Sequence, residues 1–411
     1  MRIAYICADR GIQPDGHGGS SRHVSEMVNS LVARGNEVTV FAASVAGAGT
    51  ELAGDIVDLR GHAPLAGLQS SLQKAARLAE DESWAAREIQ AIFDNEALGA
   101  ALADLHPLPD MVYERQSLWA VAGLRYAKAH RIPHLLEVNA PLVAQQLEYR
   151  QLELASAAAG IENWMIAGTD RLLVTSPSLV DYVRAHGATR RNVRLVRCGV
   201  PAALLERTVG GGGKAATRDP SRFVIGFVGS LKPWHGIEVL LEAFRKLHAA
   251  DFCYRLLIVG DGPERLAIER YLRVHGLDAF CEMTGDVPAS EIPRQLARMD
   301  VGVAPYPELT SFYFSPLKIW EYAGAGVPIA ASAIGDLPQL FPHKEGALLH
   351  RPGSANKLAL HITKLRENPD LGARLARRAK RTARAHTWDR IAGRVESIAA
   401  AAIRARPPIV R

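Results

Sequence analysis

The sequence has few cysteines, and none of them stands in a metal-binding or redox pattern. Its 411 residues contain four, Cys7, Cys198, Cys253 and Cys281, which are too far apart to form a Cys-x-x-Cys pair. Zinc-finger and thioredoxin-like classes are therefore excluded, and we expect no metal site.

The sequence also lacks a long apolar run. The apolar run in the first residues, MRIAYICADR, ends at Asp9, which is too early for a signal peptide. No segment approaches the roughly 20 apolar residues that a membrane span needs. These absences predict a reduced, cytoplasmic protein.

The length, composition and net charge of the chain are typical of a globular protein with anionic partners. A chain of 411 residues is long for one core and predicts two domains. Hydrophobic residues make up 48% and charged residues 22%, an ordinary balance that excludes disordered and fibrous classes. The net charge of +6 favours phosphorylated small molecules, nucleic acid or a membrane surface, and composition does not choose among them.

The two halves of the chain begin alike. Residues 2–8 predict a buried strand, Gly16 to Gly19 a glycine-rich loop, residues 20–34 a helix and residues 37–41 the next strand. Residues 223–229 predict another strand, followed by a loop at 230–236, a helix and a strand at 255–259. Each half therefore starts as a nucleotide-binding unit, and we predict an α/β protein of two doubly wound Rossmann-like domains facing across a cleft.

The domain boundary is predicted from a run of glycines. Gly210 to Gly213 and the polar residues after them indicate a flexible linker at 206–221, between domains at 1–205 and 222–386. Residues 51–106 are alanine-rich and predicted to be helical. Further strands are predicted at 111–114, 134–138, 172–175 and 193–196 in the first half and at 280–283, 301–304 and 328–331 in the second.

The segment YFSPLKIWEYAGAGVP, residues 313–328, predicts an anion site at the start of a helix. Ser315 and Pro316 suit the N-cap and the first helical position, where backbone N–H groups are free and the helix dipole is positive. Lys318 adds a cation, and Glu321 can accept hydrogen bonds from a ribose. Phosphate and ribose sites within two turns indicate a nucleotide, and an ordinary surface helix is the alternative.

Several loops are predicted to meet at one edge of their sheets. They are Gly16–Gly19, Ser230–Gly236, Gly260–Pro263 and Gly285–Pro288. Gly18 and Gly19 would let a ligand approach the backbone, and Lys232 and His235 bring two groups that can carry positive charge. Because open α/β sheets bind ligands at the carboxyl ends of their strands, these loops predict a pocket. Tight turns with a surface lysine and a capping histidine are the alternative.

Taken in order, these motifs resemble the family 4 glycosyltransferases of the GT-B fold. The resemblance rests on Gly-Gly after the first strand, G-S-L-K-P-W-H-G, V-G-D-G-P, T-G-D-V-P and S-P-L-K-I-W-E-Y-A-G-A-G-V-P, and it covers nearly the whole chain. In the first half, Y-E-R at 113–115 and E-V-N-A-P-L at 137–142 look like acceptor-side segments of one subgroup.

The resemblance implies a retaining transfer of a sugar from a nucleotide diphosphate sugar to a hydroxyl of an acceptor glycan, lipid or small molecule. It implies no cofactor, no metal and no nucleic acid partner. The domain at 1–205 would serve the acceptor, the domain at 222–386 would bind the donor, and a helix within 387–411 would return to the first domain. The two domains are expected to close on the donor.

The resemblance also implies roles for individual residues. Lys232 and His235 would stabilise the leaving diphosphate, and Glu137 and Asn139 would face the sugar or the acceptor. The donor-binding positions that it implies are Gly18, Gly19, Gly229, Ser230, Gly262, Asp286, Val287, Ser315, Pro316, Leu317, Lys318 and Glu321.

The sequence departs from the family pattern at two places. The family has a glutamate eight positions before the one at Glu321, and this chain has Tyr313 there. The usual arginine and lysine of the diphosphate loop fall at Ser230 and His235, so Lys232, with Lys318, would supply the charge. These departures leave the donor sugar open.

Two other function classes remain at this stage. A regulatory protein could hold a nucleotide sugar without turning it over, and an epimerase of the same fold could act on one. The arginines and lysine between 374 and 384 form a basic helical face, which is either solvated or attached peripherally to the inner face of a membrane.

Overall fold

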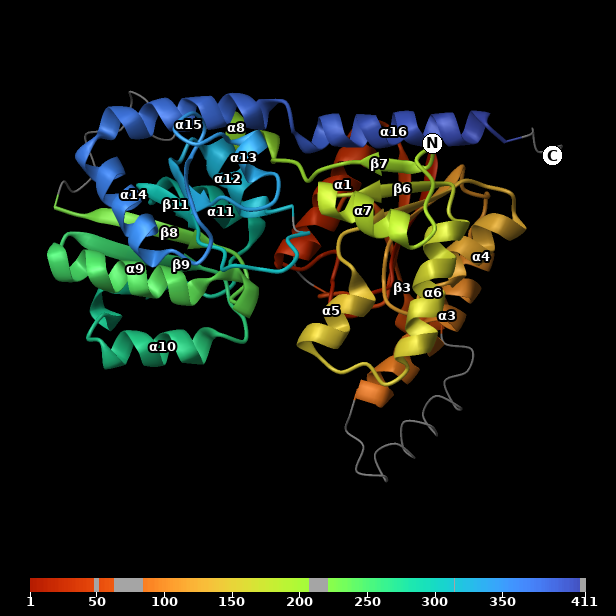
Figure 1. The fold of residues 1–411 in the computed structure, drawn as a ribbon. Coiled ribbons are helices and arrows are strands. Elements are labelled where there is room, and N and C mark those ends of the chain that lie inside the picture. The colour runs from red at the N-terminus through yellow and green to blue at the C-terminus, as the bar shows by residue number, and fades with distance from the viewer. Residues whose placement is uncertain (48–51, 63–83, 207–220, 314, 407–411) are drawn as a thin grey trace.

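The fold consists of two α/β domains, each built on a parallel sheet (Figure 1). The computed structural model describes residues 1–47, 52–62, 84–206, 221–313 and 315–406. The predicted fold class, with two doubly wound domains, is confirmed.

The N-terminal sheet has seven strands in the order β3-β2-β1-β4-β5-β6-β7. They are β1 (Arg2–Cys7), β2 (Glu37–Ala42), β3 (Asp55–Asp58), β4 (Met111–Arg115), β5 (His134–Val138), β6 (Arg171–Val174) and β7 (Val193–Leu195). The helices are α1 (Gly19–Ala33), α3 (Trp84–Ala103), α4 (Ala122–Ala129), α5 (Leu142–Tyr149), α6 (Ala155–Gly168) and α7 (Pro177–Ala185). The central strands are buried along their length, as parallel strands covered by helices on both faces are expected to be.

The C-terminal sheet has six strands in the order β10-β9-β8-β11-β12-β13. They are β8 (Phe223–Val228), β9 (Tyr254–Val259), β10 (Cys281–Met283), β11 (Val301–Ala304), β12 (Ile329–Ser332) and β13 (Leu348–His350). Its helices are α9 (Ile237–Ala250), α10 (Arg265–Val274), α11 (Ile292–Ala297), α12 (Leu317–Ala325), α13 (Leu337–Leu340), α14 (Ala355–Glu367) and α15 (Pro369–Arg384).

Every strand predicted from the sequence is present, and two strands were missed. β3 lies within residues predicted to be helical, and β13 was not predicted. Both are short and occupy one edge of their sheets, where few residues carry the pattern. Their pairing with β2 and β12 is a tertiary interaction that local sequence does not encode.

The chain crosses between the domains at two adjacent segments. The N–H of Val200 donates to the carbonyl of His386 at 2.9 Å, and the N–H of Trp388 donates to the carbonyl of Val200 at 3.3 Å. α8 (Ala202–Glu206), which follows Val200, already packs on α12 and α15. The first crossing therefore precedes the linker predicted at 206–221, of which residues 207–220 lie outside the described part of the chain.

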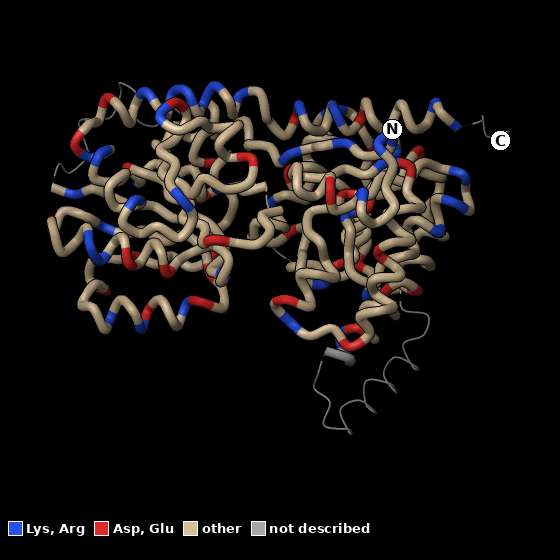
Figure 2. Tube along the Cα trace, viewed as in Figure 1, with Lys and Arg blue, Asp and Glu red and all other residues tan. Residues whose placement is uncertain are grey.

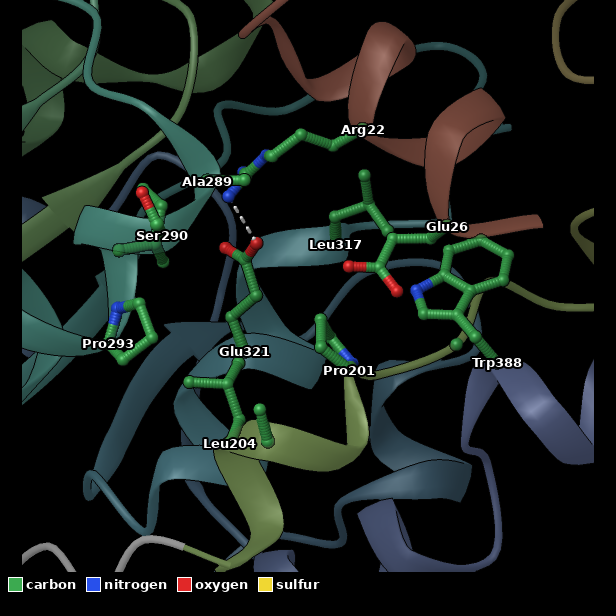
Figure 3. A pocket seen from close by; sticks show the side chains of 13 residues that line it. Arg22, Glu26, Pro201, Leu204, Ala289, Ser290, Pro293, Leu317, Glu321 and Trp388 are labelled. Atoms are coloured by element: carbon green, nitrogen blue, oxygen red, sulfur yellow. Dashed lines mark ion pairs between the residues drawn. The ribbon is translucent and has the colours of Figure 1, made fainter. Parts of the chain in front are cut away.

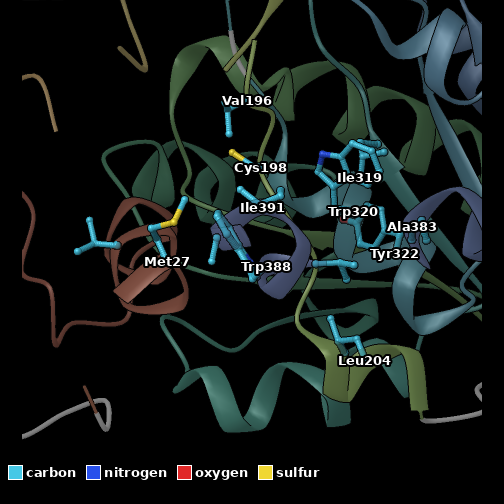
Figure 4. Packing of buried hydrophobic residues seen from close by; sticks show 14 of the residues in the cluster. Met27, Val196, Cys198, Leu204, Ile319, Trp320, Tyr322, Ala383, Trp388 and Ile391 are labelled. Carbon is cyan, nitrogen blue, oxygen red and sulfur yellow. The ribbon is translucent and has the colours of Figure 1, made fainter. Parts of the chain in front are cut away.

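The last described helix, α16 (Trp388–Arg404), lies along α1 of the N-terminal domain (Figure 1). Arg34 at the end of α1 forms ion pairs with Asp389 at 3.0 Å and Glu396 at 2.8 Å. Trp388 is buried where α16 begins, within an apolar cluster that includes Met27 of α1 and Trp320 of α12 (Figure 4). The two domains therefore share one continuous core at this seam.

Among the described residues, no helix combines the length and apolar character that crossing a membrane would require.

Candidate functional site

The helix predicted to bind an anion is α12, and it begins at Leu317. Its N-cap is Pro316, which has no side-chain hydrogen bond to the helix. The sequence predicted Ser315 as the cap, and this prediction is wrong. The Ser315 hydroxyl instead accepts a hydrogen bond from the N–H of Cys198 at 3.2 Å, because the loop before α12 packs against the other domain. The N–H groups of Leu317 and Lys318 remain in the open first turn of the helix.

Lys318 is held in an unusual position for a lysine. It is 6% exposed, and its amine has no hydrogen-bond partner among the described residues. Nζ lies 4.1 Å from the centre of the Phe227 ring and 5.5 Å from that of Tyr306. Burial lowers the pKa of this amine to about 7, although nearby Glu321 raises it. The site thus holds a desolvated amine, and a bound anion would raise its pKa and stabilise its protonated form.

The loop after β8 leaves room for this amine. At Gly229, φ is +135°, and an added Cβ would lie 3.2 Å from Nζ of Lys318. A side chain at position 229 would therefore be strained and would crowd the lysine. Ser230, the next residue, offers its carbonyl to the ring of His235.

His235 differs from the prediction that it brings positive charge. Its Nδ1 lies 2.5 Å from the carbonyl of Ser230, so this nitrogen donates. Burial lowers the pKa of His235 well below its usual value, and Lys318 lowers it further. The ring is therefore neutral in the ligand-free protein, and Lys232 is the residue of this loop that can carry the positive charge.

Lys232 points toward the N-terminal domain. Burial lowers its pKa, and Arg150 beyond the end of α5 lowers it further, whereas Asp9 after β1 raises it. Its amine lies 5.2 Å from the ring centre of Trp234, which itself contacts Tyr149 of α5 at 4.8 Å between ring centres. The loop at 230–236 thus faces the N-terminal domain.

The remaining positions predicted to bind the donor lie on neighbouring loops of the two sheets. Gly262 follows β9, and Asp286 and Val287 follow β10; the Asp286 carboxylate accepts from the N–H of Asp261 at 3.2 Å. Gly18 caps α1, and a Cβ on Gly19 would lie 4.0 Å from Leu317. The first turns of α1 and α12 therefore meet, which brings together the predicted positions from both domains.

Glu321 lies one turn into α12 and is held by a residue that sequence reasoning missed. Its Oε1 forms an ion pair with Nη1 of Arg22 at 2.7 Å, and its Oε2 has no partner in the described chain. Arg22 belongs to α1, so the pair joins the two domains (Figure 3). The signal that could have found it is its position in the first turn of the helix that follows the glycine loop.

The Arg22–Glu321 pair lines a cavity of about 330 Å³ between the domains (Figure 3). Leu204, Pro293 and Trp388 contribute apolar walls. Glu26, one turn after Arg22, also lines it, and burial raises the pKa of Glu26 to about 7 despite the opposing effect of Arg22. The cavity thus has charged groups on the α1 and α12 sides and apolar side chains elsewhere.

Glu137, predicted to face the sugar or the acceptor, is buried and does not line this cavity. It is 3% exposed, forms an ion pair with His23, and accepts a hydrogen bond from the hydroxyl of Tyr113 at 2.9 Å. Although burial opposes its ionisation, the charge of His23 holds the pKa of Glu137 at about 2, and Glu137 in turn raises the pKa of His23 to about 9. Both carboxylate oxygens are engaged, so Glu137 is not free to act on a substrate.

Asn139, by contrast, keeps a donor available. It follows β5, and its Nδ2 is buried without a hydrogen-bond partner among the described residues. Such an unpaired buried donor destabilises the folded protein unless a ligand accepts its hydrogen bond. Asn139 therefore fits the predicted role at the sugar or acceptor better than Glu137 does.

Tyr313, which stands where the resemblance implies a glutamate, belongs to the domain contact. It is buried in an apolar cluster of the N-terminal domain that contains Val138 and Leu179. The neighbouring Phe312 carbonyl accepts from the hydroxyl of Ser178 at 2.8 Å. Phe312, Tyr313 and Ser315 thus anchor the start of α12 to the other domain.

Comparison with known proteins adds two family descriptions. Residues 17–204 match the model of "Glycosyltransferase Family 4", and residues 222–368 match that of "Glycosyl transferases group 1". The chain is 31% identical over 36% of its length to 2-deoxystreptamine glucosyltransferase of Streptomyces kanamyceticus, 37% of which is matched. It is 23% identical over 88% of its length to glycogen synthase of Mycobacterium tuberculosis, 86% of which is matched.

Solved structures show the same fold. Sucrose-phosphate synthase from Thermosynechococcus elongatus superposes with a TM-score of 0.74 at 20% identity, covering 98% of this chain and all of that one. HepE from Anabaena, solved in complex with UDP-glucose, gives a TM-score of 0.68 at 16% identity, with 98% and 100% coverage.

Proposed function

Since the chain is a GT-B glycosyltransferase that carries a family 4 and a group 1 domain, we propose that it transfers a sugar from a nucleotide diphosphate sugar to an acceptor hydroxyl with retention of configuration. The acceptor would be a glycan, a lipid or a small molecule. No cofactor or metal is part of the proposal.

The proposal rests mainly on two buried polar atoms of α12 that have no partner among the described residues. The buried amine of Lys318 and the Oε2 of Glu321 lie one turn apart without partners in the described chain. The oxygens of a diphosphate would accept hydrogen bonds from the amine and from the open N–H groups of the first turn, and the hydroxyls of a ribose would donate to the carboxylate. A nucleotide diphosphate carries both groups at that spacing.

Retention is supported by the state of the acceptor-side carboxylate. Because Glu137 is occupied by His23 and Tyr113, it cannot act as a base on the far face of the sugar. In the proposed step the bond between the anomeric carbon and the phosphate oxygen breaks, and the acceptor oxygen bonds to that carbon from the same face. The acceptor proton passes to the departing phosphate oxygen, and Lys232 and Lys318 stabilise the charge that develops there.

The direct test is turnover of a panel of nucleotide sugars with acceptor extracts. Release of free nucleoside diphosphate that depends on the acceptor, with the anomeric configuration of the product kept in its NMR spectrum, supports the proposal. Binding without release indicates a regulatory protein. Conversion of the sugar without an acceptor indicates an epimerase, and an inverted product contradicts retention.

We expect Glu321→Ala to weaken nucleoside diphosphate binding through loss of the ribose contact. One lost charge-assisted hydrogen bond corresponds to roughly 1.5–3 kcal/mol. Calorimetric titration of the nucleoside diphosphate measures this, with Glu345→Ala on the protein surface as the control. Unchanged affinity of the Glu321 variant contradicts its role.

We expect Lys232→Ala to lower turnover far more than it lowers stability. A preorganised donor at the leaving group is worth roughly 2.7–4 kcal/mol, about 10²- to 10³-fold in rate, by analogy with oxyanion donors. Turnover at saturating donor and the melting temperature should be measured together. A variant that turns over at the wild-type rate removes Lys232 from the mechanism.

Peripheral attachment to a membrane stays a prediction. Arg374, Arg377, Arg381 and Arg384 are exposed on the outer side of α15, where Figure 2 shows a row of basic residues. Such a face suits anionic headgroups, and it equally suits a solvated surface.

A further inference from the structure

The ion pair of Arg22 and Glu321 occupies the carboxylate that the proposed function assigns to the ribose. The side chains are 13% and 7% exposed, so the pair forms in a largely desolvated place between the domains. Nε of Arg22 has no partner among the described residues. The guanidinium therefore has donors left over while it rests on Glu321 (Figure 3).

The diphosphate site close by is short of positive charge. The resemblance implies an arginine at position 230, where this chain has Ser230, and His235 is neutral. Burial lowers the pKa values of Lys232 and Lys318. A guanidinium keeps its charge in such surroundings, and its fork matches the oxygens of a phosphate.

Arg22 comes from the part of α1 that meets the start of α12. Gly19, one turn earlier in α1, lies beside Leu317, the first residue of α12. Glu321 lies one turn beyond Leu317, so the guanidinium is within about a helical turn of the open N–H groups that would receive the diphosphate. Reaching those groups requires the guanidinium to move by about this distance.

We propose that Arg22 exchanges partners when the donor binds: the ribose takes Glu321, and the released guanidinium moves to the diphosphate in place of the arginine that the loop at 230–236 lacks. This role rests on the proposed function. It makes Arg22 a specificity-determining residue, because a nucleoside without phosphates must displace the guanidinium and gives it no new partner. A nucleoside diphosphate replaces the lost carboxylate with phosphate oxygens.

The test compares Arg22→Met with wild type in calorimetric titrations with uridine and UDP, and in parallel with the guanosine and adenosine pairs. For the base that the wild type binds, we expect the affinity for the diphosphate to fall roughly 10- to 100-fold and the affinity for the nucleoside to rise several-fold. Arg34→Met is the matched control, since Arg34 is on the same helix but pairs with Asp389 and Glu396.

Opposite changes for the two ligands support the exchange. A fall for both ligands makes Arg22 a structural residue, and a rise for both makes it only a competitor for Glu321, so either result overturns the proposal. If Arg22→Met does not fold, Arg22→Lys is measured in its place. A lysine variant that does not keep the wild-type preference for the diphosphate over the nucleoside contradicts a role for the positive charge. Failure of the wild type to bind any of the diphosphates overturns the proposed function itself, and the exchange with it.

Discussion

Replacing Lys318 with methionine is expected to stabilise the folded protein and at the same time to weaken nucleoside diphosphate binding. The amine is buried without a partner among the described residues, and its pKa is about 7 instead of 10.5. This difference corresponds to a destabilisation on the order of 4 kcal/mol near neutral pH. Methionine fills a similar volume without a buried charge, but it cannot contact a diphosphate.

The pH dependence of this effect has a definite sign. Between about pH 7 and pH 10.5 the unfolded chain keeps a proton that the folded protein has released, so the contribution of Lys318 to stability rises with pH. The advantage of Lys318→Met should therefore be largest at or below about pH 7 and should shrink as the pH approaches 10.5.

Urea unfolding at several pH values, together with calorimetric binding, measures both effects. Lys246→Met is the control, because Lys246 lies on the surface beside Glu242 and should change stability by less than about 0.5 kcal/mol. A Lys318 variant that is less stable than wild type at neutral pH would show that the amine has a partner in the folded protein.

Replacing Glu137 with glutamine is expected to destabilise the protein by roughly 3–5 kcal/mol, because it leaves the buried His23 without its carboxylate. The same change should affect stability more than it affects donor binding, since both carboxylate oxygens of Glu137 are engaged inside the protein and Glu137 does not line the cavity. The double variant with His23→Gln should lose less than the sum of the two single variants, because the pair is one interaction. Simple additivity would mean that the two side chains do not depend on each other.

The wild-type pH profile follows from the same pair. The raised pKa of His23, about 9, contributes stability that is complete below 6.5 and is lost as the pH rises through 9. The lowered pKa of Glu137, about 2, contributes stability that is complete above 4.5 and is lost as the pH falls through 2. Melting temperatures near pH 6 and pH 9 should therefore differ in the wild type, and this difference should shrink in Glu137→Gln.

The fold could be predicted from the sequence because the signals for each strand, loop and helix lie within that segment of the chain. The apolar runs of β1 and β8, the glycine loops after them and the helices that follow are neighbours in the chain, and each predicted its own element. The role of α12 in presenting Lys318 and Glu321 was also predictable, because both residues lie within two turns of one helix.

Only the tertiary structure decided which groups meet across the cleft. Arg22 and Glu321 are far apart in the chain, as are His23 and Glu137, and Ser315 binds Cys198 instead of capping its helix. A motif shows that a side chain is present, but burial and a partner on another element determine whether it is charged and free. For that reason Glu137 was expected at the substrate and lies in an ion pair, and Lys318, expected as an ordinary cation, is a buried amine with a pKa near 7.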